Sequence, residues 1–152
     1  TFIAAIGNPV GRGIVVGNMI RRKAKPFTYV HPHTVIARTA QLGSGVFVCP
    51  MSVVSAEVRV GDYCIINLHC SIGHDVVLGG YCTLSPHVGL SGGVQVGEGV
   101  FFGTGAQVLP GVKIGAHARI GAGAIIMRDV PDFATMMTRP AAPQPLTQKG
   151  PA

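Results

Sequence analysis

The sequence carries little charge and few aromatic side chains. Charged residues make up 12% of its 152 residues, aromatic residues make up 6%, and tryptophan is absent. No uninterrupted apolar run reaches the roughly 18 residues of a membrane-spanning helix, and the opening TFIAAIG has neither the basic leader nor the cleavage pattern of a signal peptide. These absences, together with 47% hydrophobic residues, predict a single domain without a membrane span, which we expect in the cytoplasm.

The net charge of +6 is spread along the chain. The exception is the cluster Arg21, Arg22, Lys23 and Lys25, for which a solvated helix end is the simplest interpretation. Scattered basic residues argue against nucleic acid as a partner. They are equally compatible with a small acidic ligand such as a phosphate-rich coenzyme.

What the sequence does have is a period of six residues. From Thr34 to Asp129 it divides into consecutive hexapeptides with no insertion. The third position is Ile, Leu or Val in every hexapeptide except the one that contains Phe102. The first position is small or β-branched, and the fourth is usually Gly, Ser or Asn. A fixed internal period of this kind predicts a repeat architecture.

The period also predicts the shape of that architecture. Within each hexapeptide the first and third side chains point to one side and the second points to the other, as in a short β-strand. The small residues that follow turn the chain. Three strands and three turns close a triangular coil, and successive coils stack at about 4.8 Å. The sequence therefore predicts an all-β parallel β-helix of a little over five coils.

Two shorter pieces flank the repeat. Residues 1–27 are expected to form a strand, Phe2–Ile6, and a helix with Asn8 as N-cap and Pro9 at its first position, ending near Lys23. The apolar face expected for this helix contains Val10, Ile14, Met19 and Ile20. The β-helix is predicted to occupy residues 28–133. Residues 134–152 are expected to form a C-terminal extension that is extended or disordered from Arg139 onward.

Three of the four cysteines are expected to lie inside the β-helix. Cys64, Cys70 and Cys82 occupy the first position of their hexapeptides, which points inward. Cys64 and Cys82 are one coil apart, and strand spacing alone permits a disulfide between them. We favour buried free thiols that pack as small hydrophobic side chains in a reducing compartment.

The segment around His74 contains the residues best suited to catalysis. His74 stands at the fifth position of its hexapeptide, on a turn that faces solvent, and Asp75 follows it. An unperturbed imidazole has a pKa of about 6.5 and is largely neutral at pH 7, as a general base requires. Gly92 holds the same position one coil later, where a backbone N–H without a side chain permits close approach of a ligand. Taken alone, an exposed histidine and a glycine on turns are most often structural.

A family resemblance strengthens the catalytic interpretation. The stretch INLHCSIGHDVVLGGYCTLSPHVGLSGGVQVG, which begins at Ile66, resembles the bacterial sugar O-acyltransferases of the sialic-acid O-acetyltransferase (NeuD) family. These are hexapeptide-repeat acyltransferases, and they include N-acetyltransferases of nucleotide-linked amino-sugars. The opening FIAAIGN resembles the last strand of that family's N-terminal domain, and DVPDFAT resembles the family's DVPDGAT. The resemblance implies a left-handed β-helix, a homotrimer with active sites between neighbouring columns, and acetyl transfer from acetyl-CoA to a sugar or nucleotide-linked amino-sugar without a metal.

The resemblance also implies individual roles. His74 matches the family's general base, and Asp75 matches the acidic neighbour that orients it. Gly92 matches the backbone donor to the thioester carbonyl. Further implied contacts are those of Ser91, Thr83 and Ser85 with the coenzyme and of Asn67 with the acceptor sugar. The family's closing Gly-Val-Pro-Ala-Lys corresponds to Thr138–Ala142 here, so a basic contact to coenzyme phosphate is either lost or moved to Arg139.

Apolar residues at the outward second position support the trimer, because such surfaces usually find a partner: Val35, Phe47, Val53, Ile65, Val77, Phe101 and Ile125. Two alternatives stay open. His33, His69 and His87 share the sixth position, and their arrangement resembles a metal enzyme of the γ-carbonic anhydrase type, in which three imidazoles bind zinc. The other alternative is a non-catalytic trimeric scaffold.

Overall fold

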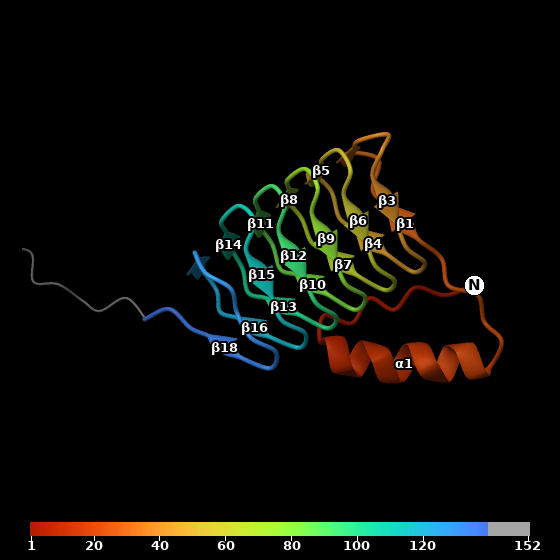
Figure 1. The fold of residues 1–152 in the computed structure, drawn as a ribbon. Helices are drawn as coiled ribbons and strands as arrows, with labels where there is room; N and C mark the ends of the chain where they lie inside the picture. The colour runs from red at the N-terminus through yellow and green to blue at the C-terminus, as the bar shows by residue number, and fades with distance from the viewer. Residues whose placement is uncertain (140–152) are drawn as a thin grey trace, which may run out of the picture.

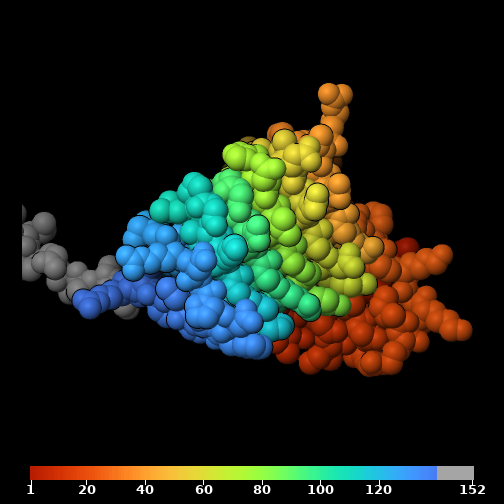
Figure 2. All heavy atoms as spheres, viewed as in Figure 1, coloured from red at the N-terminus to blue at the C-terminus, as the bar shows by residue number. Residues whose placement is uncertain are grey.

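The computed structural model describes residues 1–139, which form a three-sided, left-handed parallel β-helix with one α-helix along its side (Figure 1). The helix, α1 (Pro9–Arg21), runs along the long axis of the column. Figure 2 shows that this N-terminal part forms one side of the molecule beneath the stacked coils. Within residues 1–139, no helix is long and apolar enough to cross a membrane.

Each side of the column is a sheet of two-residue strands. The first sheet contains β1 (Tyr29–Val30), β4 (Phe47–Val48), β7 (Ile65–Ile66), β10 (Thr83–Leu84), β13 (Phe101–Phe102), β16 (Arg119–Ile120) and β18 (Thr135–Met136). The second sheet contains β2 (Val35–Ile36), β5 (Val53–Val54), β8 (Ser71–Ile72), β11 (Gly89–Leu90), β14 (Gln107–Val108) and β17 (Ile125–Ile126). The third sheet contains β3 (Gln41–Leu42), β6 (Arg59–Val60), β9 (Val77–Leu78), β12 (Gln95–Val96) and β15 (Lys113–Ile114).

The register of these sheets confirms the predicted coil. Every strand pairs in parallel with the strand one coil away, as Val53 does with Ser71 and Gly89 with Gln107. First-position and third-position side chains fill the interior, from Val46 to Val130, with Phe102 as the largest apolar side chain. Cys64, Cys70 and Cys82 are buried and free, as expected.

First-position hydroxyls and thiols have a second role that the pattern did not predict. Each donates a hydrogen bond to a backbone carbonyl of the next coil at 2.8–3.2 Å, for example from Ser52 Oγ to Asn67 O and from Cys70 Sγ to Ser85 O. The same contact recurs at Thr28, Thr34, Cys64 and Cys82. Polar side chains are therefore tolerated inside the prism because each one finds an acceptor.

The column is longer than predicted at its C-terminal end. Val130 bridges to Ile114, and β18 pairs with β16, so the repeat continues to Met136 and not to residue 133. This last coil is two residues shorter than the others, since Arg119 pairs with Thr135. The carboxylates of Asp129 and Asp132 accept hydrogen bonds from the backbone N–H groups of Lys113 and Ala116, both at 2.8 Å. The predicted disorder beyond Arg139 concerns residues 140–152, which lie outside the described part.

In the N-terminal part, the predicted cap of α1 is confirmed, but the predicted strand and the predicted buried side of α1 are not. Asn8 caps α1 by accepting a hydrogen bond from Gly11 N at 2.9 Å, as expected. The predicted strand Phe2–Ile6 is wrong, because only a single bridge from Phe2 to Pro26 forms. The expected apolar face of α1 is also wrong: its buried residues are Pro9, Arg12 and Val16, whereas Val10 is 70% exposed.

Arg12 explains why α1 buries a different side from the one predicted. Its side chain is completely buried and hydrogen-bonds to Ile6 O at 2.6 Å, Tyr81 O at 2.5 Å and Thr83 Oγ1 at 2.9 Å. Removal from water lowers the pKa of Arg12, but several oxygen acceptors surround the guanidinium. The arginine therefore fastens the N-terminal segment and α1 to β10 of the first sheet.

Candidate functional site

The three sheets meet at three corners, and each corner collects one set of turns. We name each corner by a residue: the Asn67 corner joins the first sheet to the second, the His74 corner joins the second to the third, and the Tyr81 corner joins the third to the first. The period places residues one coil apart directly above one another. Fifth-position residues of the His74 corner are, in order along the column, Arg38, Ala56, His74, Gly92, Pro110 and Arg128.

His74 and Asp75 form a pair at this corner. Nδ1 of His74 lies 2.8 Å from Oδ2 of Asp75, and the two side chains are 69% and 63% exposed. This contact occupies Nδ1 and leaves Nε2 of the imidazole free for a substrate. Asp75 adopts a left-handed backbone conformation with φ of 58°, which sets the direction in which its side chain leaves the backbone. An imidazole oriented by a carboxylate in this way is suited to accept a proton at Nε2.

Gly92 lies against the free side of that imidazole. A Cβ atom on Gly92 would lie 2.5 Å from Nε2 of His74, so only glycine leaves this space open. A backbone hydrogen bond also joins the two coils here, since Gly93 N donates to His74 O at 2.8 Å. The structure therefore confirms that Gly92 lies one coil above His74 on the same corner.

The N–H of Gly92 has no hydrogen-bond acceptor within residues 1–139. At two fifth positions an aspartate of the next coil accepts from the backbone N–H: Asp62 accepts from Ser44 N and Asp132 accepts from Ala116 N. Above Gly92 that place belongs to Pro110, whose side chain offers no acceptor. An imidazole with a free ring nitrogen and an unpaired backbone N–H thus lie side by side at the surface, an arrangement suited to acyl transfer.

Comparison with known proteins agrees with this chemistry. Residues 93–128 match the family model described as bacterial transferase hexapeptide (six repeats). The acetyltransferase domain of PglB from Neisseria gonorrhoeae FA1090 is 32% identical with a TM-score of 0.86, over 92% of this chain and 68% of that one. The chain belongs to the bacterial hexapeptide transferases. No curated protein sequence matches it.

Two further solved structures resemble this hexapeptide transferase. PerB from Caulobacter crescentus, solved with CoA and GDP-perosamine, is 37% identical with a TM-score of 0.87, over 90% of this chain and 66% of that one. WeeI from Acinetobacter baumannii AYE is 26% identical with a TM-score of 0.86, over 91% of this chain and 68% of that one. This chain therefore spans less than two thirds of the length of PerB.

The transferase does not bring all its predicted site residues to the His74 corner. Ser91 is there, beside Gly92, but Asn67 and Ser85 lie on the Asn67 corner. Asn67 donates its side-chain N–H to Leu84 O at 2.8 Å. Thr83 lies on the first sheet and is 1% exposed, because Arg12 and Gly7 O occupy its hydroxyl. A coenzyme contact at Thr83 does not fit this burial, and we leave Thr83 out of the proposed site.

The stacked histidines of the metal alternative also lie on the Asn67 corner. The rings of His69 and His87 are parallel, with centroids 5.0 Å apart. Met51 occupies the place between His33 and His69, so the three imidazoles do not converge. In residues 1–139, no group of three or more His, Cys, Asp or Glu side chains is arranged to hold a metal ion.

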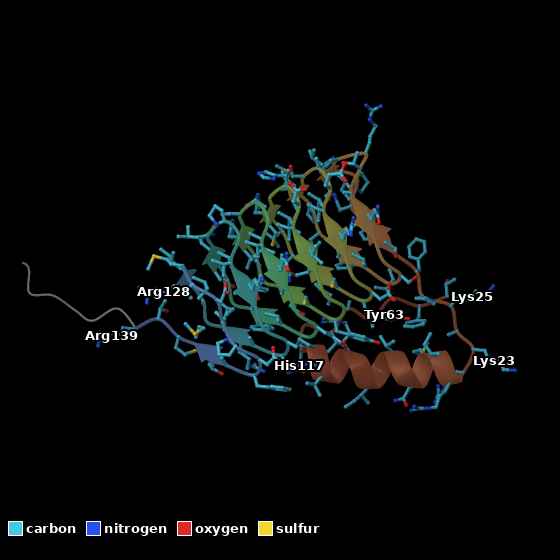
Figure 3. All side chains as sticks on the ribbon, viewed as in Figure 1. Lys23, Lys25, Tyr63, His117, Arg128 and Arg139 are labelled. Atoms are coloured by element: carbon cyan, nitrogen blue, oxygen red, sulfur yellow. The ribbon has the colours of Figure 1, made fainter. Side chains whose placement is uncertain are left out.

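The predicted apolar faces are only partly exposed. Val35, Val53 and Ile125 project from the second sheet, and Ile125 is 63% exposed. Ile65 was expected to face solvent but is 5% exposed; its partner in the next strand, Thr83, hydrogen-bonds to Arg12 and to Gly7 O of the N-terminal segment. A cavity of about 260 Å³ lies between α1 and the Tyr81 corner, lined by Val10, Tyr81, Glu98 and His117, whose position Figure 3 shows. It lies on a different corner from His74.

Proposed function

We propose that this protein transfers the acetyl group of acetyl-CoA to the amino group of a nucleotide-linked amino-sugar. The observation that carries the proposal is the contact between His74 and Gly92, which pairs a free imidazole nitrogen with an unused backbone N–H. The structures of PerB with CoA and GDP-perosamine support both the donor and the class of acceptor. O-acetylation of a sugar, as in the NeuD family, uses the same groups and is the alternative acceptor chemistry.

In the proposed reaction His74 is the general base. Nε2 of His74 takes a proton from the acceptor amine while the amine nitrogen forms a bond to the thioester carbonyl carbon. The N–H of Gly92 donates to the carbonyl oxygen, which becomes negatively charged in the tetrahedral intermediate. The carbon–sulfur bond then breaks, and the imidazolium returns a proton to the thiolate of CoA. Asp75 holds Nδ1 and stabilises the imidazolium between these steps.

The positions of the remaining candidates support the proposed homotrimer. Asn67 and Ser85 stand one corner away from His74, and the second sheet with exposed Val35, Val53 and Ile125 lies between the two corners. If a neighbouring copy packs along this sheet, its Asn67 corner can complete the site of the first copy. We place acetyl-CoA and the acceptor in such a cleft, and a cytoplasmic location stays a prediction.

The test is a thiol-release assay with acetyl-CoA and a panel of acceptors, including GDP-linked and UDP-linked amino-sugars and sialic acids. We expect release of CoA with at least one nucleotide-linked amino-sugar and none without an acceptor. Calorimetric titration with CoA distinguishes the transferase from the non-catalytic scaffold, which need not bind CoA. A protein that binds no CoA and releases no thiol with any acceptor is not the proposed transferase.

A further inference from the structure

The Tyr81 corner carries a stack of aromatic rings from which one ring is missing. Successive residues with φ between 57° and 67° at this corner are Tyr63, Tyr81, Gly99, His117 and Phe133. The rings of Tyr63 and Tyr81 stack with centroids 5.1 Å apart, and those of His117 and Phe133 stack with centroids 5.0 Å apart. Gly99 interrupts the stack between the two pairs. Figure 3 shows Tyr63 and His117 on the side of the column next to α1.

The missing ring leaves room for one planar group. Tyr81 and His117 are two coils apart, so their rings are separated by about 10 Å, twice the strand spacing. A flat group midway between them lies about 5 Å from each ring, a usual separation for stacked rings. No side chain at position 99 can take this place, because a Cβ there would lie 2.5 Å from Nδ1 of His117. The cavity of about 260 Å³ beside α1 includes this gap, since Tyr81, Gly99 and His117 line it.

The cavity combines a negative charge with an apolar wall. Glu98 lines it next to Gly99, and the carboxylate makes no ion pair within residues 1–139. No lysine or arginine of that part of the chain lines the cavity. On the α1 side it is lined by Pro9 and by Val10, which is 70% exposed. These walls match a ligand that is flat, positively charged and attached to a short apolar chain.

We propose that this cavity binds an alkylguanidinium cation. A guanidinium group is planar, and it stacks on aromatic faces through cation–π attraction. Its N–H groups form a fork that donates to both oxygens of a carboxylate, which Glu98 supplies. Stacking of this kind already occurs in the chain, where Cζ of Arg119 lies 5.5 Å from the ring centroid of Phe101. The methylene groups of the ligand lie against Val10.

This site goes beyond the proposed acetyl transfer and does not depend on it, because it lies on a different corner from His74. The shape of the gap also selects among cations. An ammonium group is a compact point charge and cannot fill a space between two parallel faces as a planar group does. A neutral planar group fills the space but gains no attraction from the charge of Glu98.

Calorimetric titration at pH 8 tests the ligand class with three probes of similar length: butylguanidinium, its neutral counterpart butylurea, and butylammonium. We expect butylguanidinium to bind with a dissociation constant of about 1 mM or lower. Butylurea should bind at least about tenfold more weakly, and butylammonium at least about threefold more weakly. N-acetylarginine amide is a fourth probe. If it binds more tightly than butylguanidinium, the natural ligand is an arginine side chain of another protein; the opposite order indicates a small molecule.

Three variants test the location. Glu98→Gln keeps the shape of the side chain and removes its charge, so it should weaken butylguanidinium binding about tenfold or more. His117→Asn removes one aromatic face, and asparagine tolerates the left-handed backbone, so binding should weaken about threefold to tenfold. Glu57→Gln is the matched control, because it removes a carboxylate from the His74 corner and should stay within about twofold of wild type. Circular dichroism checks that each variant is folded.

The proposal is wrong if wild type binds butylguanidinium no more tightly than butylurea, or if Glu98→Gln binds it as wild type does. A loss of binding in Glu98→Gln with unchanged binding in His117→Asn also contradicts it, because the cation then pairs with a surface charge and does not lie between the rings. None of these results bears on the transferase, which CoA titration and thiol release test separately.

Discussion

A Cβ atom on Gly92 would lie 2.5 Å from Nε2 of His74, so the imidazole occupies space that any other residue at position 92 would fill. The three atoms nearest to such a Cβ all belong to the imidazole of His74. The residue at position 92 therefore determines where the proposed base can lie. The relationship yields the first prediction.

Gly92→Ala should lower kcat about a hundredfold, because a displacement of a catalytic group by about 1 Å has effects of this size. The free energy of unfolding should change little, since the added methyl group meets an exposed side chain and not the backbone. The matched control is Gly80→Ala at the same repeat position of the Tyr81 corner, where the nearest atom to a new Cβ is Asp62 O at 3.4 Å. Equal kcat values for the two variants would contradict the assigned role of Gly92.

Asp75→Asn should lower kcat about tenfold, the difference between a charge-assisted and a neutral hydrogen bond to the imidazolium. Asparagine tolerates the left-handed conformation that Asp75 adopts, so the turn should be preserved. Steady-state kinetics with saturating acetyl-CoA check the change, and circular dichroism checks the fold. Glu57→Gln, on the same corner one coil earlier, is the control that should leave kcat unchanged.

Arg12→Ala should lower the free energy of unfolding by about 3 kcal/mol, because it leaves several buried oxygen acceptors unpaired. Urea denaturation measures this loss, and exposed Arg22→Ala serves as the control with a change of less than about 0.5 kcal/mol. The N-terminal segment of Arg12→Ala should also become sensitive to trypsin. A stability equal to that of wild type would mean that Arg12 does not fasten α1 to the column.

The buried thiols predict a loss of stability at alkaline pH. Burial raises the pKa of Cys70 to about 11, and burial raises the pKa of Cys64 well above its usual value. A raised thiol pKa means that the folded state retains a proton that the unfolded state loses, so stability falls as the pH rises from about 9 to 11. Denaturation at pH 8 and pH 10.5 should show this fall. Cys70→Ala should reduce its size, and an unchanged pH dependence in that variant would contradict the assignment.

The β-helix could be predicted from the sequence because the six-residue period shows which side chains point into the column. Third-position residues such as Ile72 and Leu90 had to share one face, and a fixed coil length then placed Gly92 above His74 without any knowledge of contacts. The N-cap at Asn8 was predictable for a similar reason, since capping depends only on neighbouring residues. What the period could not give was the N-terminal segment, where Arg12 finds acceptors about 70 residues away.

The candidate site was predictable only where it lies on one corner. His74 and Asp75 share a corner with Ser91 and Gly92 because the turns after β8 and β11 are one coil apart. The predicted coenzyme contact of Thr83 does not fit the structure, because Thr83 is buried against Arg12. No local sequence pattern encodes that contact.

The most direct test of the central claim is turnover by His74→Ala. Acetyl transfer to the preferred amino-sugar acceptor should fall by about a hundredfold to ten-thousandfold, as expected for loss of a general base, while CoA affinity and oligomeric state stay as in wild type. If His74→Ala retains the turnover of wild type, His74 is not the base and the proposed mechanism is wrong.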